Sequence, residues 1–148
     1  MNIKKHLFVL VWSLSFFGFS QSDTTIIKEV MQVLNAQENA WNAHDLETFM
    51  AGYWNADALV FVGSKGPTYG WKPTLEKYKK GYPTPELMGQ LAFEVLNTVV
   101  WDKQTVQMIG KFTLTRKEDQ PQGYFSLLWR KIEGQWRIVS DHSSAAAK

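Results

Sequence analysis

The stretch WNAHDLETFMAGYWNADA, residues 41–58, predicts where two helices meet and where the chain turns into its first strand. Asp45 is a good N-cap for a helix whose apolar side chains recur at i, i+3, i+4 and i+7, namely Leu46, Phe49, Met50 and Tyr53. Before this junction, apolar residues from Ile26 to Trp41 recur at three- and four-residue steps, which predicts a first helix capped by Asp23. After it, residues 58–62 predict a short buried strand.

The second half of the chain has a different pattern. Pro73 predicts the first turn of a third, short helix, which the Gly- and Pro-rich residues 81–85 end. From there the hydrophobic period is two, which predicts strands near residues 90–100, 104–116, 123–132 and 135–142. The joins between these strands are short and therefore favour antiparallel neighbours. Helices followed by a long antiparallel sheet indicate an α+β fold, with the helices on one face of the sheet.

The N-terminus has the pattern of a secretory signal peptide. Lys4 and Lys5 precede an apolar run from Leu7 to Phe19, and the run ends with cleavage predicted near Ser20. The run is shorter than the roughly 20 residues of a membrane span, so a retained anchor is the weaker reading. We therefore expect residues 1–20 to be removed and residues 21–148 to form a single secreted or periplasmic domain with no membrane association afterwards.

Composition excludes several classes of function. Removal of residues 1–20 leaves 14 basic residues against 14 acidic ones, and no basic cluster remains to bind nucleic acid. The chain has no cysteine, so it can form no disulfide. It also lacks an HExxH pair or a comparable metal-ligand spacing, and we expect neither a metal site nor another cofactor.

The order of motifs resembles that of a known superfamily. The helix junction at residues 41–46, the stretch Tyr53–Ala58, Gly70 before the short helix and the long strands ending in residues 134–144 are similar to the SnoaL-like, ketosteroid-isomerase-like branch of the nuclear transport factor 2-like superfamily, including its secreted bacterial members. The resemblance covers about residues 24–144. It implies a cone-shaped α+β barrel, also called cystatin-like, in which a strongly curved antiparallel sheet wraps around helices and opens on an apolar pocket. It also implies a homodimer.

The same resemblance argues against steroid isomerisation in its usual form. In steroid isomerases of this superfamily, an aspartate on the first strand moves the proton and a tyrosine on the first helix helps to hold the oxyanion. Those positions correspond here to Val62 and Gln37. Valine cannot titrate, and glutamine can donate a hydrogen bond but is not acidic.

The polar end of the last predicted strand supplies the candidate acid and base. Consecutive side chains of a strand point to opposite faces, so Asp141 and His142 cannot act together with a neighbouring serine as a triad. Strict alternation puts His142 on the face of Trp136 and Ile138, which is the more apolar one. We therefore predict that His142 faces the pocket and Asp141 faces away, and we take His142 and Asp141 as the catalytic candidates. Alternatively, His142 bonds only to a backbone carbonyl or to Glu94.

Aromatic side chains on several elements predict the lining of a binding cavity, although more than half of the aromatics should be ordinary core. Lys111 and Glu94 are charged residues on otherwise apolar strands, which makes them candidates for paired or functional groups. The predicted ligand-binding residues are Tyr53, Phe61, Trp71, Tyr78, Glu94, Lys111, Trp129 and His142.

Three functions are compatible with these observations. The first is an exported domain whose pocket binds a small hydrophobic or aromatic molecule. The second is an enzyme of the polyketide-cyclase, isomerase or hydratase type that uses His142 or Asp141 as acid or base. The third is a dimeric interaction module without a ligand. The sequence does not choose among them.

Overall fold

The computed structural model describes residues 22–145. This part of the chain contains four helices, two before the first strand and two between the second and third strands. They are α1 (Asp23–Asn42), α2 (Leu46–Met50), α3 (Trp71–Gly81) and α4 (Pro85–Met88). Asp45 caps α2 as predicted, because its Oδ1 accepts a 2.9 Å hydrogen bond from Thr48 N. The cap predicted for α1 is wrong by one residue: Ser22 is the N-cap, and Asp23 is the first helical residue.

Within the described residues, six strands form one sheet. They are β1 (Val60–Gly63), β2 (Gly66–Tyr69), β3 (Gln90–Asp102), β4 (Thr105–Thr115), β5 (Gln122–Ile132) and β6 (Gln135–Ala145), in the order β2-β1-β6-β5-β4-β3. The four long strands are antiparallel as predicted. The sheet is nevertheless mixed, because β1 pairs with β6 in parallel. The strand β2 was not predicted, since its residues read as a turn.

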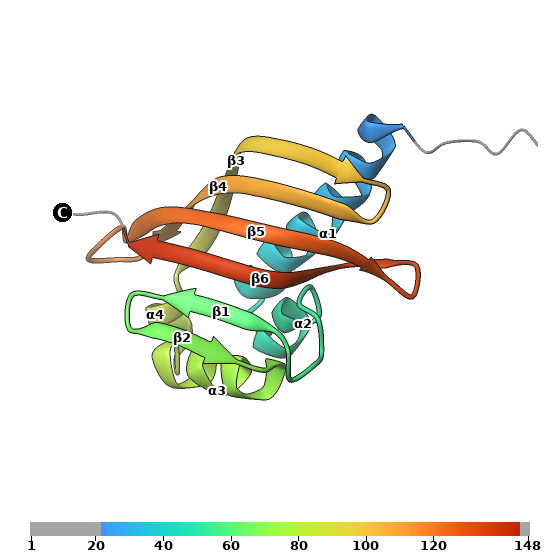
Figure 1. The fold of residues 1–148 in the computed structure, drawn as a ribbon. Coiled ribbons are helices and arrows are strands. Elements are labelled where there is room, and N and C mark those ends of the chain that lie inside the picture. The colour runs from blue at the N-terminus through green and yellow to red at the C-terminus, as the bar shows by residue number, and fades with distance from the viewer. Residues whose placement is uncertain (1–21, 146–148) are drawn as a thin grey trace, which may run out of the picture.

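The helices lie on one side of the sheet (Figure 1). The apolar stripe of α1 is buried, and so are the inward side chains of the long strands, including Trp129 and Ile138. This arrangement confirms the predicted α+β architecture. Burial of such side chains contributes most of the stability of a domain this size.

The end of α1 also holds the edge strand β3. Asn42 accepts a 2.7 Å hydrogen bond from Leu91 N and donates a 2.9 Å bond to Leu91 O. One turn earlier, Glu38 accepts a 2.7 Å bond from Phe93 N. Backbone groups that an edge strand would leave open are thus paired with α1.

A β-bulge in β6 changes which side chains face inward. Trp129 pairs with Ile138 and Leu128 pairs with Ser140, so Val139 has no partner of its own on β5. An extra residue reverses the alternation of everything that follows it. As a result, Asp141 is buried and His142 is exposed, which is the opposite of the prediction.

The predicted signal peptide, residues 1–20, lies outside the described part of the chain. Between residues 22 and 145, no helix is long and apolar enough to cross a membrane.

Candidate functional site

A cavity of about 760 Å³ lies between the helices and the inward face of the sheet. Its walls are mostly aromatic and come from α1, α2, α3 and all the strands except β2. The aromatic residues that line it are Trp41, Phe49, Tyr53, Phe61, Tyr78, Tyr82, Phe93, Phe112 and Phe125. This size and composition are typical of pockets for small organic molecules.

The aromatic rings order one another. Tyr78 makes edge-on contacts with Phe49 and Phe61, with ring centroids 5.3 and 5.5 Å apart. On the opposite wall, Phe93 and Phe125 are edge-on at 5.5 Å. Edge-to-face pairs are favourable beyond their buried area, so these walls keep their shape without a ligand.

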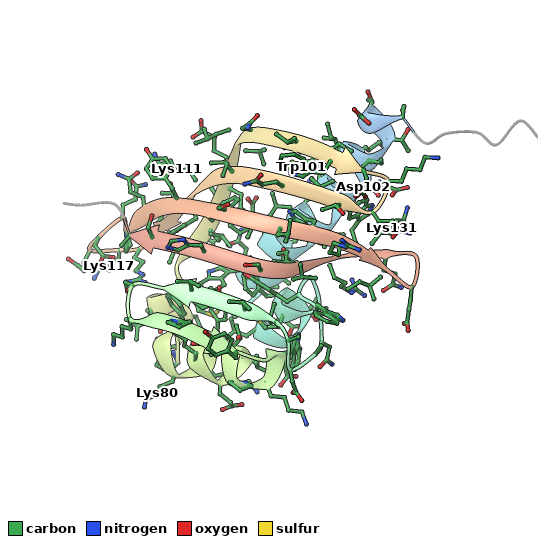
Figure 2. All side chains as sticks on the ribbon, in the orientation of Figure 1. Lys80, Trp101, Asp102, Lys111, Lys117 and Lys131 are labelled. Carbon is green, nitrogen blue, oxygen red and sulfur yellow. The ribbon has the colours of Figure 1, made fainter. Side chains whose placement is uncertain are left out.

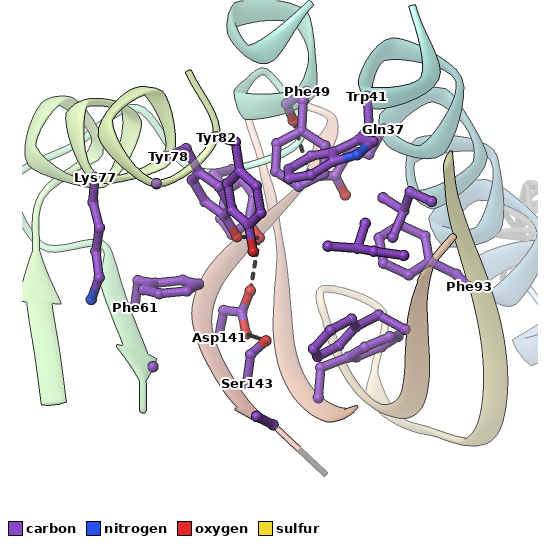
Figure 3. A pocket seen from close by; sticks show the side chains of 18 of the residues that line it. Gln37, Trp41, Phe49, Phe61, Lys77, Tyr78, Tyr82, Phe93, Asp141 and Ser143 are labelled. Carbon is purple, nitrogen blue, oxygen red and sulfur yellow. Dashed lines mark hydrogen bonds between the residues drawn. The ribbon is translucent and has the colours of Figure 1, made fainter. Parts of the chain in front are cut away.

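Asp141 is the carboxylate in this apolar space, and it is 3% exposed. Its Oδ2 accepts a 2.7 Å hydrogen bond from the Tyr53 hydroxyl, and its Oδ1 accepts a 2.8 Å bond from the Ser143 hydroxyl (Figure 3). Burial raises the pKa of Asp141 to about 6, although the bonds from Tyr53 and Ser143 oppose the rise. The carboxyl therefore gains or loses its proton close to neutral pH.

Tyr53 and Tyr78 place two hydroxyls next to this carboxyl. Their oxygens are 3.5 Å apart. Burial, together with the charge of Asp141, raises the pKa of each hydroxyl well above 10, so both remain protonated. Tyr53 donates its proton to Asp141, whereas the Tyr78 hydroxyl forms, among the described residues, one long contact, the 3.5 Å one to Tyr53. Tyr78 can therefore donate to a polar group of a molecule in the cavity.

Gln37 adds an amide to the cavity wall. Its Nε2 donates a 3.0 Å hydrogen bond to Phe49 O, and its Oε1 is buried without a partner among the described residues. A buried acceptor with no partner is costly. Gln37 therefore offers a ligand a fixed acceptor, at the position where the resemblance puts the tyrosine of steroid isomerases.

The open end of the cavity is basic. Lys65, in the turn between β1 and β2, Lys77 and Lys80 on α3 and Arg116 after β4 all line the cavity. The Lys77 ammonium donates a 3.0 Å hydrogen bond to Thr68 Oγ1 and lies 5.0 Å from the centre of the Phe61 ring.

Four of the predicted site residues line the cavity: Tyr53, Phe61, Tyr78 and Asp141. Asp141 was expected on the outer face and enters the cavity because of the bulge at Val139. His142 was expected to face inward and is instead exposed on the outer face, opposite Ser126 of β5.

The other predicted ligand-binding residues do not line the cavity. Trp71 is half-buried and donates a 2.8 Å hydrogen bond from its indole to Met50 O. Trp129 is fully buried in the core. Glu94 and Lys111 are register partners on β3 and β4 and lie outside the cavity, because their neighbours Phe93 and Phe112 occupy the inward positions.

Several cavity residues were missed. Phe93 could have been found, since it alternates with Glu94 along a strand. Ser143 lines the cavity because it lies two residues after Asp141 on β6, and the bulge turns both side chains inward. Arg116 follows the last residue of β4, and nothing in its local pattern marks it as a cavity residue. Within residues 22–145, no group of three or more His, Asp or Glu side chains is arranged to hold a metal ion.

Comparison with known proteins agrees with this architecture. Residues 20–148 match the AtzH-like family. An NTF-2 like protein of unknown function from Shewanella oneidensis MR-1 is 37% identical in sequence, and its structure aligns with a TM-score of 0.78 over 80% of this chain and 98% of that one. No curated protein matches the chain.

Two more distant structures show the same fold. A ketosteroid isomerase-like protein from Erwinia carotovora atroseptica SCRI1043 is 18% identical, with a TM-score of 0.68 over 82% of this chain and 96% of that one. A cystatin-like protein of unknown function from Nostoc punctiforme PCC 73102 is 16% identical, with a TM-score of 0.67 over 87% of this chain and 96% of that one. At these identities the likeness concerns the fold alone.

Proposed function

The chain belongs to the AtzH-like family and has the nuclear transport factor 2-like fold, and from this premise we propose that its cavity binds a small hydrophobic or aromatic molecule. The observation that supports this most directly is an aromatic cavity in which a few polar groups converge. Ligand sites are commonly mostly apolar, with a small number of placed polar groups that orient the ligand. Here those groups are Asp141, Tyr53 and Tyr78.

The ligand's apolar body would lie against Phe61, Phe93 and Phe125. A hydroxyl, carbonyl or amine at its inner end would meet Tyr78, whose hydroxyl can donate, or Asp141, which can accept. The ligand's polar group would form hydrogen bonds with these side chains in place of the bonds that water makes to them in the empty cavity. A ligand without such a group would leave them unpaired, so the bonds give specificity as well as affinity.

Binding is tested by isothermal calorimetry with a panel of bicyclic aromatic compounds. Phe61→Ala should weaken binding by about tenfold, because it removes part of an aromatic wall. Tyr69→Ala is the matched control, since Tyr69 is an exposed aromatic on β2 that does not line the cavity. If no compound in the panel binds, or if the two substitutions weaken binding equally, the proposal fails.

A second candidate function is proton transfer by Asp141. The observation that favours it is a buried carboxyl whose pKa is about 6, next to a tyrosine hydroxyl in an apolar space. A carboxylate in such a site can act as a general base near neutral pH, and Tyr78 could donate to the oxygen on which charge develops. Under this second proposal, the base would be Asp141 and the donor Tyr78, in place of the positions that correspond to Val62 and Gln37.

The two functions differ in what Asp141→Asn does. If the protein only binds, the variant should keep most of the affinity. If it transfers protons, the wild type should accelerate deuterium exchange of the acidic carbon-bound hydrogens of 2-tetralone, as followed by NMR, and the variant should not. Equal exchange rates for the two proteins would leave binding as the function.

We also propose that the domain acts after export, because residues 1–20 have the pattern of a signal peptide. N-terminal sequencing of the protein recovered from its native host, in the medium or the periplasm, tests this. A mature N-terminus near Gln21 is expected, whereas an intact N-terminus on cytoplasmic protein would contradict it.

A further inference from the structure

We infer that the ligand carries an acidic group, and that the basic residues at the open end of the cavity hold it. This inference rests on the proposed binding function and narrows it to a class: aromatic or other apolar carboxylates. It concerns the opening of the cavity, a different part of the site from Asp141 and the two tyrosines.

The basic residues come from separate parts of the chain that meet at one end of the molecule. The turn between β1 and β2, the C-terminal end of β6 and the loop between β4 and β5 lie together at the left of Figure 1. Lys80, near the end of α3, and Lys117, in the loop after β4, project at the same end in Figure 2. Lys65 lies in the turn between β1 and β2, and Arg116 begins the loop after β4, so residues of two of these segments bring positive charge to the cavity.

Charge in the cavity is distributed unequally. Four basic residues line it, Lys65, Lys77, Lys80 and Arg116, and Asp141 is the acid among the lining residues. Asp141 is buried, whereas Lys65 and Lys80 are exposed at the opening. A cleft with apolar walls and one sign of charge concentrates molecules of the opposite charge.

These cations have few partners of their own. Within residues 22–145, none of the three lysines forms an ion pair with a carboxylate. In the described part of the chain, the Lys77 ammonium donates a hydrogen bond to the neutral hydroxyl of Thr68 and lies over the Phe61 ring, and neither partner carries a charge. An ammonium group has three donors, so Lys77 retains donors for an incoming anion.

Arg116 is the strongest candidate to contact that anion. Its side chain is 19% exposed, and its guanidinium lies 5.9 Å from the centre of the Tyr82 ring. Its nearest acid is Asp119, with Nη1 and Oδ2 3.6 Å apart, and its buried Nε has no partner among the described residues. A buried donor without an acceptor is costly, and the planar guanidinium matches the two oxygens of a carboxylate.

Electrostatics also set the orientation of the ligand. A carboxylate would be repelled by the ionised Asp141, so it would stay at the open end near Arg116 and Lys77. The apolar body would then extend inward along the aromatic walls, and its inner end would reach Tyr78. The two ends of the cavity thus select for a molecule with an acid at one end and an uncharged polar or apolar group at the other.

A pair of compounds with the same rings tests the inference. 2-Naphthoate is an anion at neutral pH, and 2-naphthamide is neutral and nearly identical in shape. By calorimetry at low salt, the protein should bind 2-naphthoate about tenfold more tightly, because charge-assisted hydrogen bonds are stronger than neutral ones. This preference should shrink at high salt, since the open end is partly accessible to solvent.

Three variants locate the effect. Arg116→Gln and Lys77→Met should each lower the affinity for 2-naphthoate several-fold and leave that for 2-naphthamide unchanged. Lys117→Gln is the matched control, because Lys117 is 93% exposed, lies next to Arg116 and does not line the cavity. It should leave the affinity for both compounds unchanged. Circular dichroism tests whether each variant is folded. If Arg116→Gln does not fold, the comparison between Lys77→Met and the wild type tests the inference.

The outcomes separate this inference from the proposed function. Equal affinity of the wild type for the two compounds would overturn the inference and leave the binding function standing. A preference that survives both Arg116→Gln and Lys77→Met would also overturn it. If neither compound binds, the inference falls, and the proposed function falls with it only if no other compound of the bicyclic panel binds.

Discussion

The Tyr53 hydroxyl donates a 2.7 Å hydrogen bond to Asp141 Oδ2, which joins two residues 88 positions apart. The backbone strengthens this link just beside the bulge, because Ile138 N donates to Gly52 O at 3.0 Å and Trp54 N donates to Ile138 O at 2.9 Å. The segment after α2 is thus fixed against β6. The cavity consequently contains a carboxyl whose position does not depend on a ligand.

Asp141 should make the protein more stable at mildly acidic pH. Its pKa is about 6 in the folded state and 3.8 in the unfolded chain, so between these values the folded state binds more protons. The free energy of unfolding therefore falls as pH rises through this window, and from well below pH 4 to well above pH 6 this group accounts for a fall of about 3 kcal/mol. Urea unfolding of the wild type and Asp141→Asn at several pH values measures it.

In Asp141→Asn this part of the pH dependence should disappear, because the amide can still accept from Tyr53 but does not titrate. The exposed Asp57→Asn is the control and should keep the wild-type dependence. Parallel stability curves for the wild type and Asp141→Asn would contradict the assignment.

Tyr53→Phe should raise the pKa of Asp141 above its wild-type value. The Tyr53 hydroxyl donates to the ionised carboxylate and stabilises it, which lowers the pKa of Asp141. Without this hydrogen bond, the effect of burial, which raises the pKa, is opposed only by the remaining contacts. Carboxyl carbon shifts followed by NMR titration measure the change. Tyr124→Phe removes an exposed hydroxyl and should leave the Asp141 titration where it is.

Asn42→Ala should destabilise the fold by about 2 kcal/mol, because both backbone groups of Leu91 lose their partner. Asn39→Ala, one turn earlier on α1 and exposed, should change stability by less than about 0.5 kcal/mol. Chemical unfolding of the two variants gives the difference. Because alanine is a better helix former than asparagine, helix propensity alone would stabilise both variants, and similar losses for both would contradict the role of the contact with β3.

Gly110→Ala should also destabilise, by about 2 kcal/mol, because the added methyl group would overlap the Phe125 ring on the neighbouring strand. The displaced ring would enter the cavity, so affinity for aromatic compounds should fall as well. At Gly81 an added methyl group meets nothing within 4 Å, which makes Gly81→Ala the control for the stability measurement. Wild-type stability of Gly110→Ala in thermal unfolding would show that Phe125 can move at no cost.

The homodimer implied by the resemblance stays a prediction, and the outer face of the sheet is where we expect it. Tyr124 and Leu128 are 51% and 38% exposed on β5, alternating with buried residues. Sedimentation velocity at micromolar concentration should show a dimer for the wild type and a monomer for Tyr124→Asp. The control Tyr69→Asp changes an exposed aromatic on β2. A wild type that is monomeric would refute the expectation.

The fold was predictable because its signals are local or periodic. The cap at Asp45 and the apolar residues that follow it define α2, although the helix ends at Met50 and Tyr53 of the predicted stripe lies beyond it. Period two defines the four long strands, whose antiparallel order follows from short joins. The parallel pairing of β1 with β6 was not predictable in this way, because it joins segments about 80 positions apart. The short strand β2 was missed because glycine and proline dominate its surroundings.

The candidate site was predicted less well, and the reason is physical. Tyr53, Phe61 and Tyr78 were found because aromatic residues on different elements tend to converge. The orientations of Asp141 and His142 were inverted, because strict alternation cannot reveal an extra residue at Val139. The basic opening was missed because its members are far apart in sequence and ordinary in their local context.

The bulge at Val139 has a consequence for comparing relatives of this chain. In a relative without the extra residue, the alignment needs a one-residue gap opposite Val139. An alignment without that gap would assign His142 to the position that lines the cavity and Asp141 to the outer face of the sheet. Two relatives with identical chemistry could then look as if they used different residues, and two with different chemistry could look alike. Transfer of residue roles to or from this chain should therefore be anchored on three-dimensional superposition around Ile138 and Asp141, with gap placement decided by which side chain faces Tyr53.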